Sequence, residues 1–176
     1  MNHYIKHFRE IGITDIATVG GKNASLGEMF SKLSAKGIPV PDGFATNAFA
    51  FEEMLTKNSL HAPLRELMQQ LDREKYTNLE STGAKARKLM MDAVLPDSLQ
   101  TAIVDAYREL CGNSSCAVAV RSSATAEDLP HASFAGQHES YLNIQGETAL
   151  LEATKKCFAS LYTNRAIKYR EDNGFA

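Results

Sequence analysis

The sequence predicts a helix-rich α/β (α+β) domain. Apolar residues recur at helical spacing, at positions i, i+3, i+4 and i+7, along most of the chain. Runs with the character of strands are short and dispersed, and the clearest of them is the apolar run 116–120, which predicts a buried strand. With 176 residues and 44% hydrophobic content, the chain is long enough to bury a substantial core, as one domain or two small lobes.

The first predicted helix covers residues 25–36. Ser25 and Glu28 fit a capping box at its start, and Gly37 is expected to end it. Two prolines that follow Gly37 require an extended exit from the helix. The apolar positions of this helix are Leu26, Met29, Phe30 and Leu33.

After a short strand at residues 44–46, five further helical segments are expected. The fourth of these segments begins at Pro96 and Asp97, and the polar turn 111–115 separates it from the strand at 116–120. The fifth breaks near Thr163 and ends before Gly174. The five apolar stripes are Phe51, Met54 and Leu55; Leu64, Leu67, Met68 and Leu71; Ala86, Leu89, Met90 and Ala93; Leu99, Ile103, Ala106, Tyr107 and Leu110; and Leu150, Ala153, Cys157 and Leu161.

Charge and hydropathy exclude several classes of function. The 19 Lys and Arg residues against 21 Asp and Glu give a formal net charge of -2, which offers no basic field for nucleic-acid binding. The chain contains no run of 18 apolar residues that would mark a membrane span, and its first residues lack the apolar region of a signal peptide. We therefore expect a cytoplasmic protein with no membrane or nucleic-acid partner.

The cysteines and histidines predict neither a disulfide framework nor a metal site. The cysteines, Cys111, Cys116 and Cys157, are odd in number and lack CxxC spacing, so we expect reduced structural residues. The five histidines are scattered, without an HExxH pattern or other paired spacing.

A glycine pair with a lysine, Gly20-Gly21-Lys22, precedes the first predicted helix. Two glycines permit backbone conformations that other residues avoid, so Lys22 could be directed toward a phosphate near a helix N-terminus. The P-loop pattern GxxxxGK[ST] is absent, because Asn23 follows the lysine. An ordinary turn with a solvated lysine is the alternative interpretation.

Arg121 ends the apolar run at 116–120 and is the strongest single candidate for anion binding. A guanidinium at the end of a strand leaves the core, and its planar donors suit bidentate binding of phosphate or carboxylate. The alternative is a structural ion pair with Glu127 or Asp128, which are close in sequence. The residues alone leave both interpretations open.

Hydroxyls and a glycine loop follow Arg121. Ser122, Ser123 and Thr125 could contact phosphate or ribose, although such residues also form loops through local backbone hydrogen bonds. Gly136, next to Gln137, allows the backbone to approach a ligand closely, so this segment could cover a phosphate chain. A simple hairpin loop is the alternative.

Three segments carry a resemblance to a known family. Residues 19–29 (VGGKNASLGEM), 40–45 (VPDGFA) and 119–130 (AVRSSATAEDLP) closely resemble the phosphoenolpyruvate synthase (pyruvate, water dikinase) family, and residues 134–143 extend the match. The resemblance covers essentially the whole chain. The loop after Arg121 also resembles that of the rifampin phosphotransferases, and this neighbouring family remains an alternative.

The resemblance implies that residues 1–176 are the N-terminal portion of an ATP-binding domain, the first lobe of an ATP-grasp-like fold. By similarity, Lys22 and Arg121 would bind the nucleotide phosphates, and the Gly136 loop would cover them. Ser140 would occupy a position that usually holds threonine, and Ser122, Thr125 and Gln137 would make further contacts. The ligands of Mg²⁺ would lie in a second lobe, so no metal-binding or catalytic residue is assigned to this chain.

The implied parent reaction converts ATP, pyruvate and water to phosphoenolpyruvate, AMP and phosphate through a phosphohistidine. Pyruvate would be bound only by domains beyond these residues, and the resemblance also allows a homodimer. We therefore expect ATP to be the direct partner of the chain, and the isolated chain to be inactive as a dikinase. A stand-alone nucleotide-binding or interaction module without catalysis is the remaining alternative.

Overall fold

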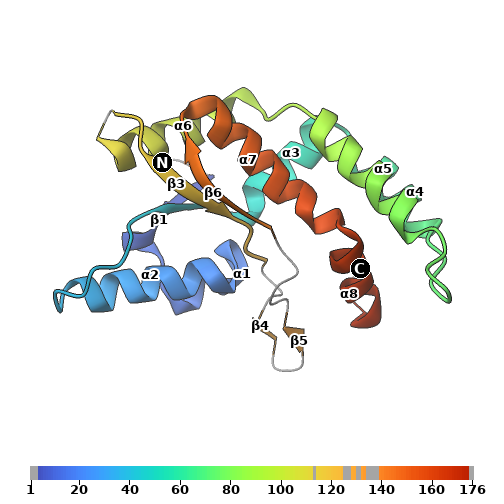
Figure 1. Ribbon diagram of the computed structural model, residues 1–176, viewed down its shortest axis with the longest axis horizontal. Helices are drawn as coiled ribbons and strands as arrows, with labels where there is room; N and C mark the ends of the chain where they lie inside the picture. The colour runs from blue at the N-terminus through green and yellow to red at the C-terminus, as the bar shows by residue number, and fades with distance from the viewer. Residues whose placement is uncertain (1–3, 113, 125–127, 130–131, 134–138, 175–176) are drawn as a thin grey trace.

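The computed structural model describes residues 4–112, 114–124, 128–129, 132–133 and 139–174 (Figure 1). Helices predominate, and the predicted helix-rich α+β class is confirmed. The helices are α1 (Ile16–Val19), α2 (Gly21–Ser34), α3 (Ala48–Lys57), α4 (His61–Gln69), α5 (Leu79–Asp92), α6 (Asp97–Cys111), α7 (Glu147–Ala159) and α8 (Asn164–Asp172), with 3-10 turns η1 (Phe8–Glu10), η2 (Ile13–Asp15) and η3 (Ser160–Tyr162).

Within the described residues, the strands pair as three small antiparallel sheets. Strand β1 (Ile5–His7) pairs with β2 (Phe44–Thr46), and the predicted strand at residues 44–46 is therefore confirmed. Strand β3 (Ala117–Arg121) pairs with β6 (Ser140–Gln145). Between these two, β4 (Asp128–Leu129) pairs with β5 (Ala132–Ser133). The β3–β6 pair is the part of the fold that positions the site.

The main core lies among α3, α5, α6 and α7. Met54, Met90, Leu99 and Ile103 are its largest fully buried side chains outside α8, and each comes from a predicted apolar stripe. Figure 1 shows α5 and α7 running side by side, with α3 behind them. The periodicity of the sequence therefore predicted this core, because helices that pack on one face repeat their apolar residues every three to four positions.

A second, smaller cluster supports α2. Phe8, Ile11, Val19, Ala24 and Ala45 are buried together, so the cluster joins η1, α1 and α2 to strand β2. Figure 1 shows α1 and α2 on one side of the β3–β6 pair, with α7 and α5 on the other. The start of α2 thus has its own apolar support.

Helix α2 begins four residues earlier than the sequence predicted. Its first residue is Gly21, so Ser25 lies inside the helix and the predicted capping box is wrong. Gly20 separates α1 from α2 with φ 82° and ψ 161°, a backbone conformation that is essentially restricted to glycine. The helix ends at Ser34, and Gly37 follows with φ 75°, as a glycine after a helix end should.

Strand β3 is not the buried strand that its apolar run suggested. Val118 and Val120 pack toward the main core, whereas Ala117, Ala119 and Arg121 are exposed. Helix α7 packs against both strands of the β3–β6 pair, whereas the outward-facing residues of β3 are exposed. The apolar run therefore predicted the strand correctly and its burial wrongly.

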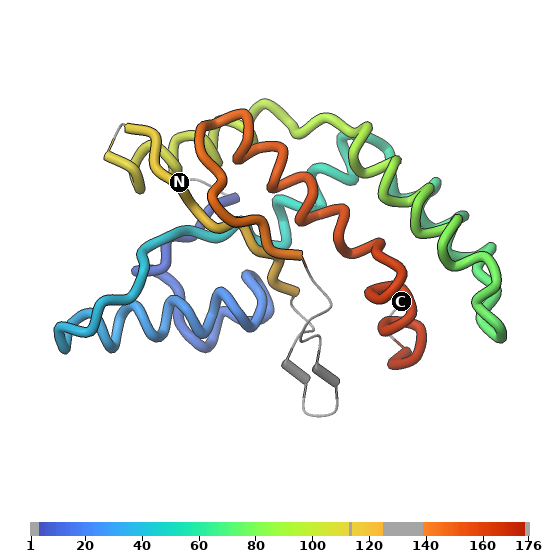
Figure 2. The backbone as a smooth tube through the Cα atoms, viewed as in Figure 1, coloured from blue at the N-terminus to red at the C-terminus, as the bar shows by residue number. Residues whose placement is uncertain are grey.

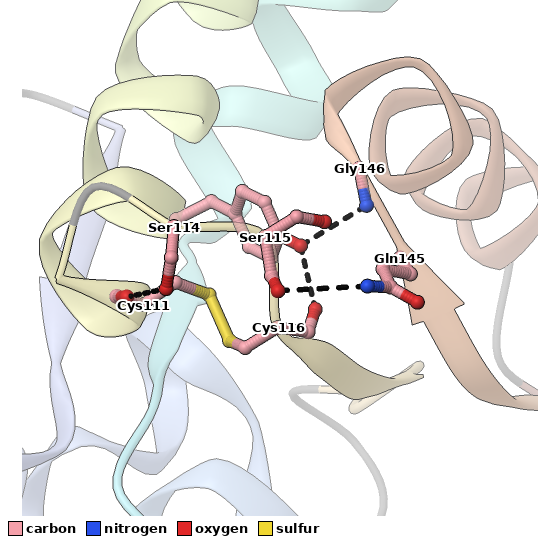
Figure 3. Close-up of a disulfide and its surroundings, with 7 residues drawn as sticks. Cys111, Ser114, Ser115, Cys116, Gln145 and Gly146 are labelled. Atoms are coloured by element: carbon pink, nitrogen blue, oxygen red, sulfur yellow. Dashed lines mark hydrogen bonds between the residues drawn. A yellow bond between two sulfur atoms is a disulfide. The ribbon is translucent and has the colours of Figure 1, made fainter.

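Two of the three cysteines form a disulfide, contrary to the prediction of reduced thiols. Cys111, at the end of α6, is joined to Cys116, just before β3, with their Cα atoms 5.5 Å apart (Figure 3). Gly112 adopts φ 61° and turns the chain back, which brings the two side chains together. The prediction holds for Cys157, a free and buried cysteine whose thiol pKa is raised by burial to about 12.

The break in the last helical segment occurs where it was predicted. α7 ends at Ala159, η3 follows, and α8 starts after Thr163, whose Oγ1 accepts a hydrogen bond from Ala166 N at 3.3 Å. Gly174 follows α8 with φ 70°. Across the described ranges, no helix is both long enough and apolar enough to span a bilayer.

Candidate functional site

The start of α2 and the end of β3 lie against each other. A Cβ atom added at Gly20 would overlap Ser123 Oγ and would stand 2.8 Å from Ala124 O. Asn23 N also donates a hydrogen bond to Ser123 Oγ at 3.4 Å, across 100 positions of sequence. Figure 2 shows this approach, with α1 and the start of α2 in blue beside the segment in gold that follows β3. The GGK motif and the segment after Arg121 are therefore one structural unit.

Lys22 is the second residue of α2 and is exposed. The N–H groups in the first turn of an α-helix have no acceptor within the helix, and they carry the positive end of the helix dipole. One of them belongs to Asn23, and it is directed to Ser123, while Asn23 Nδ2 donates to Val19 O at 2.8 Å. These bonds hold the first turn of α2 in a defined orientation, with the lysine at its start.

Arg121 and Ser140 face each other directly across the β3–β6 pair. They form the last pair of the ladder, and both are exposed, on the face of the pair opposite to Val120 and Tyr141. Among the described residues, Arg121 makes no side-chain hydrogen bond or ion pair. Its proposed structural partners, Glu127 and the side chain of Asp128, lie outside the described part. This arrangement presents a cation and a hydroxyl together.

Ser122 points to the opposite face of the sheet from Arg121. Its N–H donates to Glu139 O at 3.4 Å, which continues the ladder by one residue, and side chains alternate between faces along a strand. Ser122 Oγ is buried and has no hydrogen-bond partner in the described structure. A buried hydroxyl without a partner is uncommon in proteins, and here it lies one residue from the exposed Arg121.

A shallow hollow of about 420 Å³ lies behind the sheet, on the side of Ser122. The sequence did not predict it. Glu139 lines it and forms an ion pair with Arg165 on α8 at 2.6 Å. Tyr141 also lines it, and its pKa is raised by burial and, to a lesser degree, by the neighbouring Cys157 and Glu139. The remaining lining residues are Arg87, Lys88, Met91, Lys156, Ala159, Ser160 and Thr163. These residues come from α5, β6, α7, η3 and two loop positions, so no single stretch of sequence predicts the hollow.

Other predicted site residues lie outside the described part of the structure. They are Thr125, Gly136 and Gln137, so the predicted phosphate-covering loop has no structural description here. Ser123, one of the hydroxyls proposed to contact phosphate, lies against Gly20 and accepts a hydrogen bond from Asn23 N. No contact was assigned to Gly20 or Asn23 from the sequence, although the glycine pair was noted. In the described ranges, no three His, Cys, Asp or Glu side chains are grouped to hold a metal ion.

The sequence matches the family described as pyruvate phosphate dikinase, AMP/ATP-binding domain, over residues 16–176. The chain belongs to this family. The match begins at the first residue of α1, so it includes both the GGK motif and the β3–β6 pair. In the family description, the bound ligand of this domain is AMP or ATP.

Several curated relatives are similar along nearly the whole chain. Phosphoenolpyruvate synthase of Synechocystis sp. is 50% identical over 175 residues, which cover 96% of this chain and 21% of that protein. Phosphoenolpyruvate synthases of Pseudomonas aeruginosa and Escherichia coli are 47% and 46% identical, covering 99% and 96% of this chain. These two matches cover 22% and 21% of those relatives. The chain thus spans about a fifth of the length of these proteins.

Proposed function

We propose that this chain is the part of a phosphoenolpyruvate synthase that grips the phosphates of ATP, with Lys22 and Arg121 as the two cations. The observation that carries the proposal is the contact between Gly20 and Ser123. It brings the N-terminal turn of α2 to the end of β3, so that two motifs with separate phosphate-binding chemistry serve one site. Their resemblance to the family's nucleotide motifs supports the same assignment.

Each side chain has a distinct part in this proposal. The guanidinium of Arg121 suits two parallel hydrogen bonds to phosphate oxygens, whereas Lys22 supplies a compact charge beside the positive end of α2. The Ser140 hydroxyl, opposite Arg121, can donate a further hydrogen bond to the same phosphate chain. Ser122, Thr125, Gln137 and the Gly136 loop remain predicted contacts.

The residues proposed for this site suit the binding of a metal–nucleotide complex better than the binding of a bare metal ion. Cations and backbone donors stabilise phosphate oxygens, and Mg²⁺ bound with the nucleotide would neutralise the remaining charge. We propose that the carboxylates that hold Mg²⁺, the acceptor histidine and the pyruvate site belong to other parts of the complete enzyme. On this proposal the chain orients ATP in the cytoplasm but does not itself make phosphoenolpyruvate.

Isothermal titration of Mg-ATP into the chain tests the proposal. We expect Arg121→Ala and Lys22→Ala each to weaken binding by about tenfold or more, because a charge-assisted contact is lost. Lys36→Ala, which removes an exposed cation beyond the other end of α2, is the matched control and should bind as the wild type does. Equal heats from the wild type and Arg121→Ala would contradict the proposal.

A second measurement tests the proposal that the chain alone does not make phosphoenolpyruvate. AMP formation by the purified 176-residue chain should not depend on added pyruvate. Pyruvate-dependent AMP production would show that the chain carries out more of the reaction than nucleotide binding.

A further inference from the structure

Strand β6 contains one more residue than the part of β3 that it faces. Val118 pairs with Ile144, but Val120 pairs with Tyr141, so Ala119 alone faces both Leu142 and Asn143. This is a β-bulge, and Asn143 in it has φ 56°, in the left-handed region. Asparagine adopts this conformation more readily than most residues, whereas β-branched residues avoid it.

The bulge decides which side chains of β6 face outward. Because side chains alternate along a regular strand, an unbulged pairing that started from Val118 and Ile144 would place Tyr141 opposite Arg121. Ser140 would then turn inward. In the observed register, Tyr141 packs on the inner side, near Cys157, and Ser140 faces outward beside Arg121.

We propose that Asn143 is a positioning residue for the nucleotide site, acting by holding the bulge that places Ser140, and not Tyr141, beside Arg121. The role of this pair in binding ATP phosphates rests on the proposed function, but the role of Asn143 in setting the register does not. Asn143 lies three residues from Ser140, and its own amide is not required to touch the ligand.

Thiol labelling tests the register without any nucleotide. The Ser140→Cys chain should label rapidly with a maleimide, and the Tyr141→Cys chain slowly, because the two positions face opposite sides. Background labelling should be low: Cys111 and Cys116 are joined to each other, and Cys157 is buried with its pKa raised to about 12.

Adding Asn143→Val to each chain should reverse this order. Valine disfavours the left-handed conformation, so the Ser140→Cys thiol should label about tenfold more slowly and the Tyr141→Cys thiol faster. Asn143→Gly keeps the conformation accessible and should leave both rates unchanged. Unchanged labelling rates in the folded Asn143→Val chains would overturn the proposal.

A deletion of Asn143 provides a second variant if Asn143→Val does not fold. The deletion removes the extra residue, so regular alternation again places Ser140 outward and Tyr141 inward. We therefore expect native-like labelling from the shortened strand. Rapid labelling of the Tyr141→Cys thiol in this background would contradict the alternation on which the proposal rests.

Titration with Mg-ATP then connects the register to the site. Asn143→Gly should bind within about twofold of the wild type, whereas Asn143→Val should bind about tenfold more weakly. An equal loss in both variants would mean that the amide itself contacts the nucleotide, and the proposal would be wrong. Changed labelling in Asn143→Val with binding unaffected would instead contradict the proposed role of Arg121 and Ser140, leaving the register inference intact.

Discussion

The two ends of strand β3 are built in opposite ways. At its start, Cys116 is linked to Cys111 and its carbonyl accepts a hydrogen bond from Tyr107 Oη at 2.6 Å (Figure 3). The Tyr107 hydroxyl also accepts from Gly146 N, at 3.0 Å, just before α7. At its end, Arg121 is exposed and makes no side-chain bond within the described residues.

This difference indicates a division of roles along five residues. The start of β3 is linked to α6 by the disulfide and the Tyr107 hydrogen bond, and Tyr107 also binds the start of α7. The polar groups at this end therefore have partners within the protein. Hydrogen bonds from Ser115 and then from the Gly146 N–H lower the pKa of Tyr107, which reflects the number of donors at that hydroxyl. The other end keeps a cation exposed and, at Ser122, a buried hydroxyl with no partner among the residues that the structure describes. A strand that is held in place at its start, and that keeps polar groups without partners among the described residues at its end, is suited to presenting those groups to a ligand.

The largest expected effect comes from Gly20→Ala, which places a methyl group against the segment that follows Arg121. The new methyl group overlaps Ser123 and requires a glycine-only conformation, so we expect about 3 kcal/mol of lost stability and weaker Mg-ATP binding. Urea unfolding and calorimetry measure the two effects. Gly37→Ala is the matched control, because its φ is also positive but nothing lies within 4 Å of its added methyl group. Equal losses from the two variants would show that Gly20 makes no essential contact.

Removing the disulfide should be the next largest effect, and it acts at the fixed end. The link joins residues five positions apart, so the chain entropy of the unfolded state predicts a loss of about 2 kcal/mol for Cys111→Ser with Cys116→Ser. The midpoint of urea unfolding measures this loss, and reductant should produce a similar loss in the wild type. We expect Mg-ATP affinity to be unchanged, and a large loss of affinity would contradict the division between the two ends.

Tyr107→Phe should destabilise the same end by a smaller amount. Tyr107 is 2% exposed, and without its hydroxyl the Cys116 carbonyl and the Gly146 N–H lose a partner, which should cost about 1–2 kcal/mol. Tyr4→Phe is the control, since the hydrogen bond between its hydroxyl and Ser98 is exposed. Differential scanning calorimetry should show a lower Tm for Tyr107→Phe than for Tyr4→Phe. Equal Tm values would show that the hydroxyl does not fasten β3.

The smallest expected effect is a pH-dependent change in stability at Asp15, the N-cap residue of α1. The pKa of Asp15 is lowered by its hydrogen bond from Lys6 and then by the Gly12 N–H. Because the folded-state pKa is the lower one, this stabilisation is present above the unfolded value of about 4 and is lost as the pH falls through the folded pKa. Asp15→Asn should therefore be slightly less stable than the wild type at pH 7, with the difference shrinking below about pH 4.

The control for this variant is Asp105→Asn. Asp105 is 63% exposed and lies 3.9 Å from Arg108, so its replacement should change stability little at either pH. A pH-independent difference between Asp15→Asn and the wild type would contradict the assigned cause.

The helical core could be predicted from the sequence because its information is local. The stripes that contain Met54, Met90 and Leu99 follow the helix period, and the break at Thr163 carries its own capping residue. The start of α2 could not be predicted in this way. A local capping pattern at Ser25 competed with a tertiary contact between Gly20 and Ser123, and the tertiary contact determined where the helix begins.

The sequence indicated the candidate site as two separate motifs, but not that they lie together. Lys22 and Arg121 were chosen for their chemistry, whereas their relation depends on Ser123 and Asn23, about 100 positions apart in the chain. The exposure of β3 could not be read from its apolar run, because it depends on how many strands and helices cover the sheet. The disulfide was missed because the spacing of Cys111 and Cys116 is informative only once the turn at Gly112 is known.

The contact between α2 and Ser123 also has a consequence for the order of folding. Neighbouring helices of the main core can pair through short loops, but this contact must first close a segment of about 100 residues. Such contacts form late, because the entropy of closure is lost before the contact stabilises the chain. The proposed phosphate site should thus assemble late, after neighbouring helices have paired. Nucleotide binding would then report the completion of folding, which helix content alone does not.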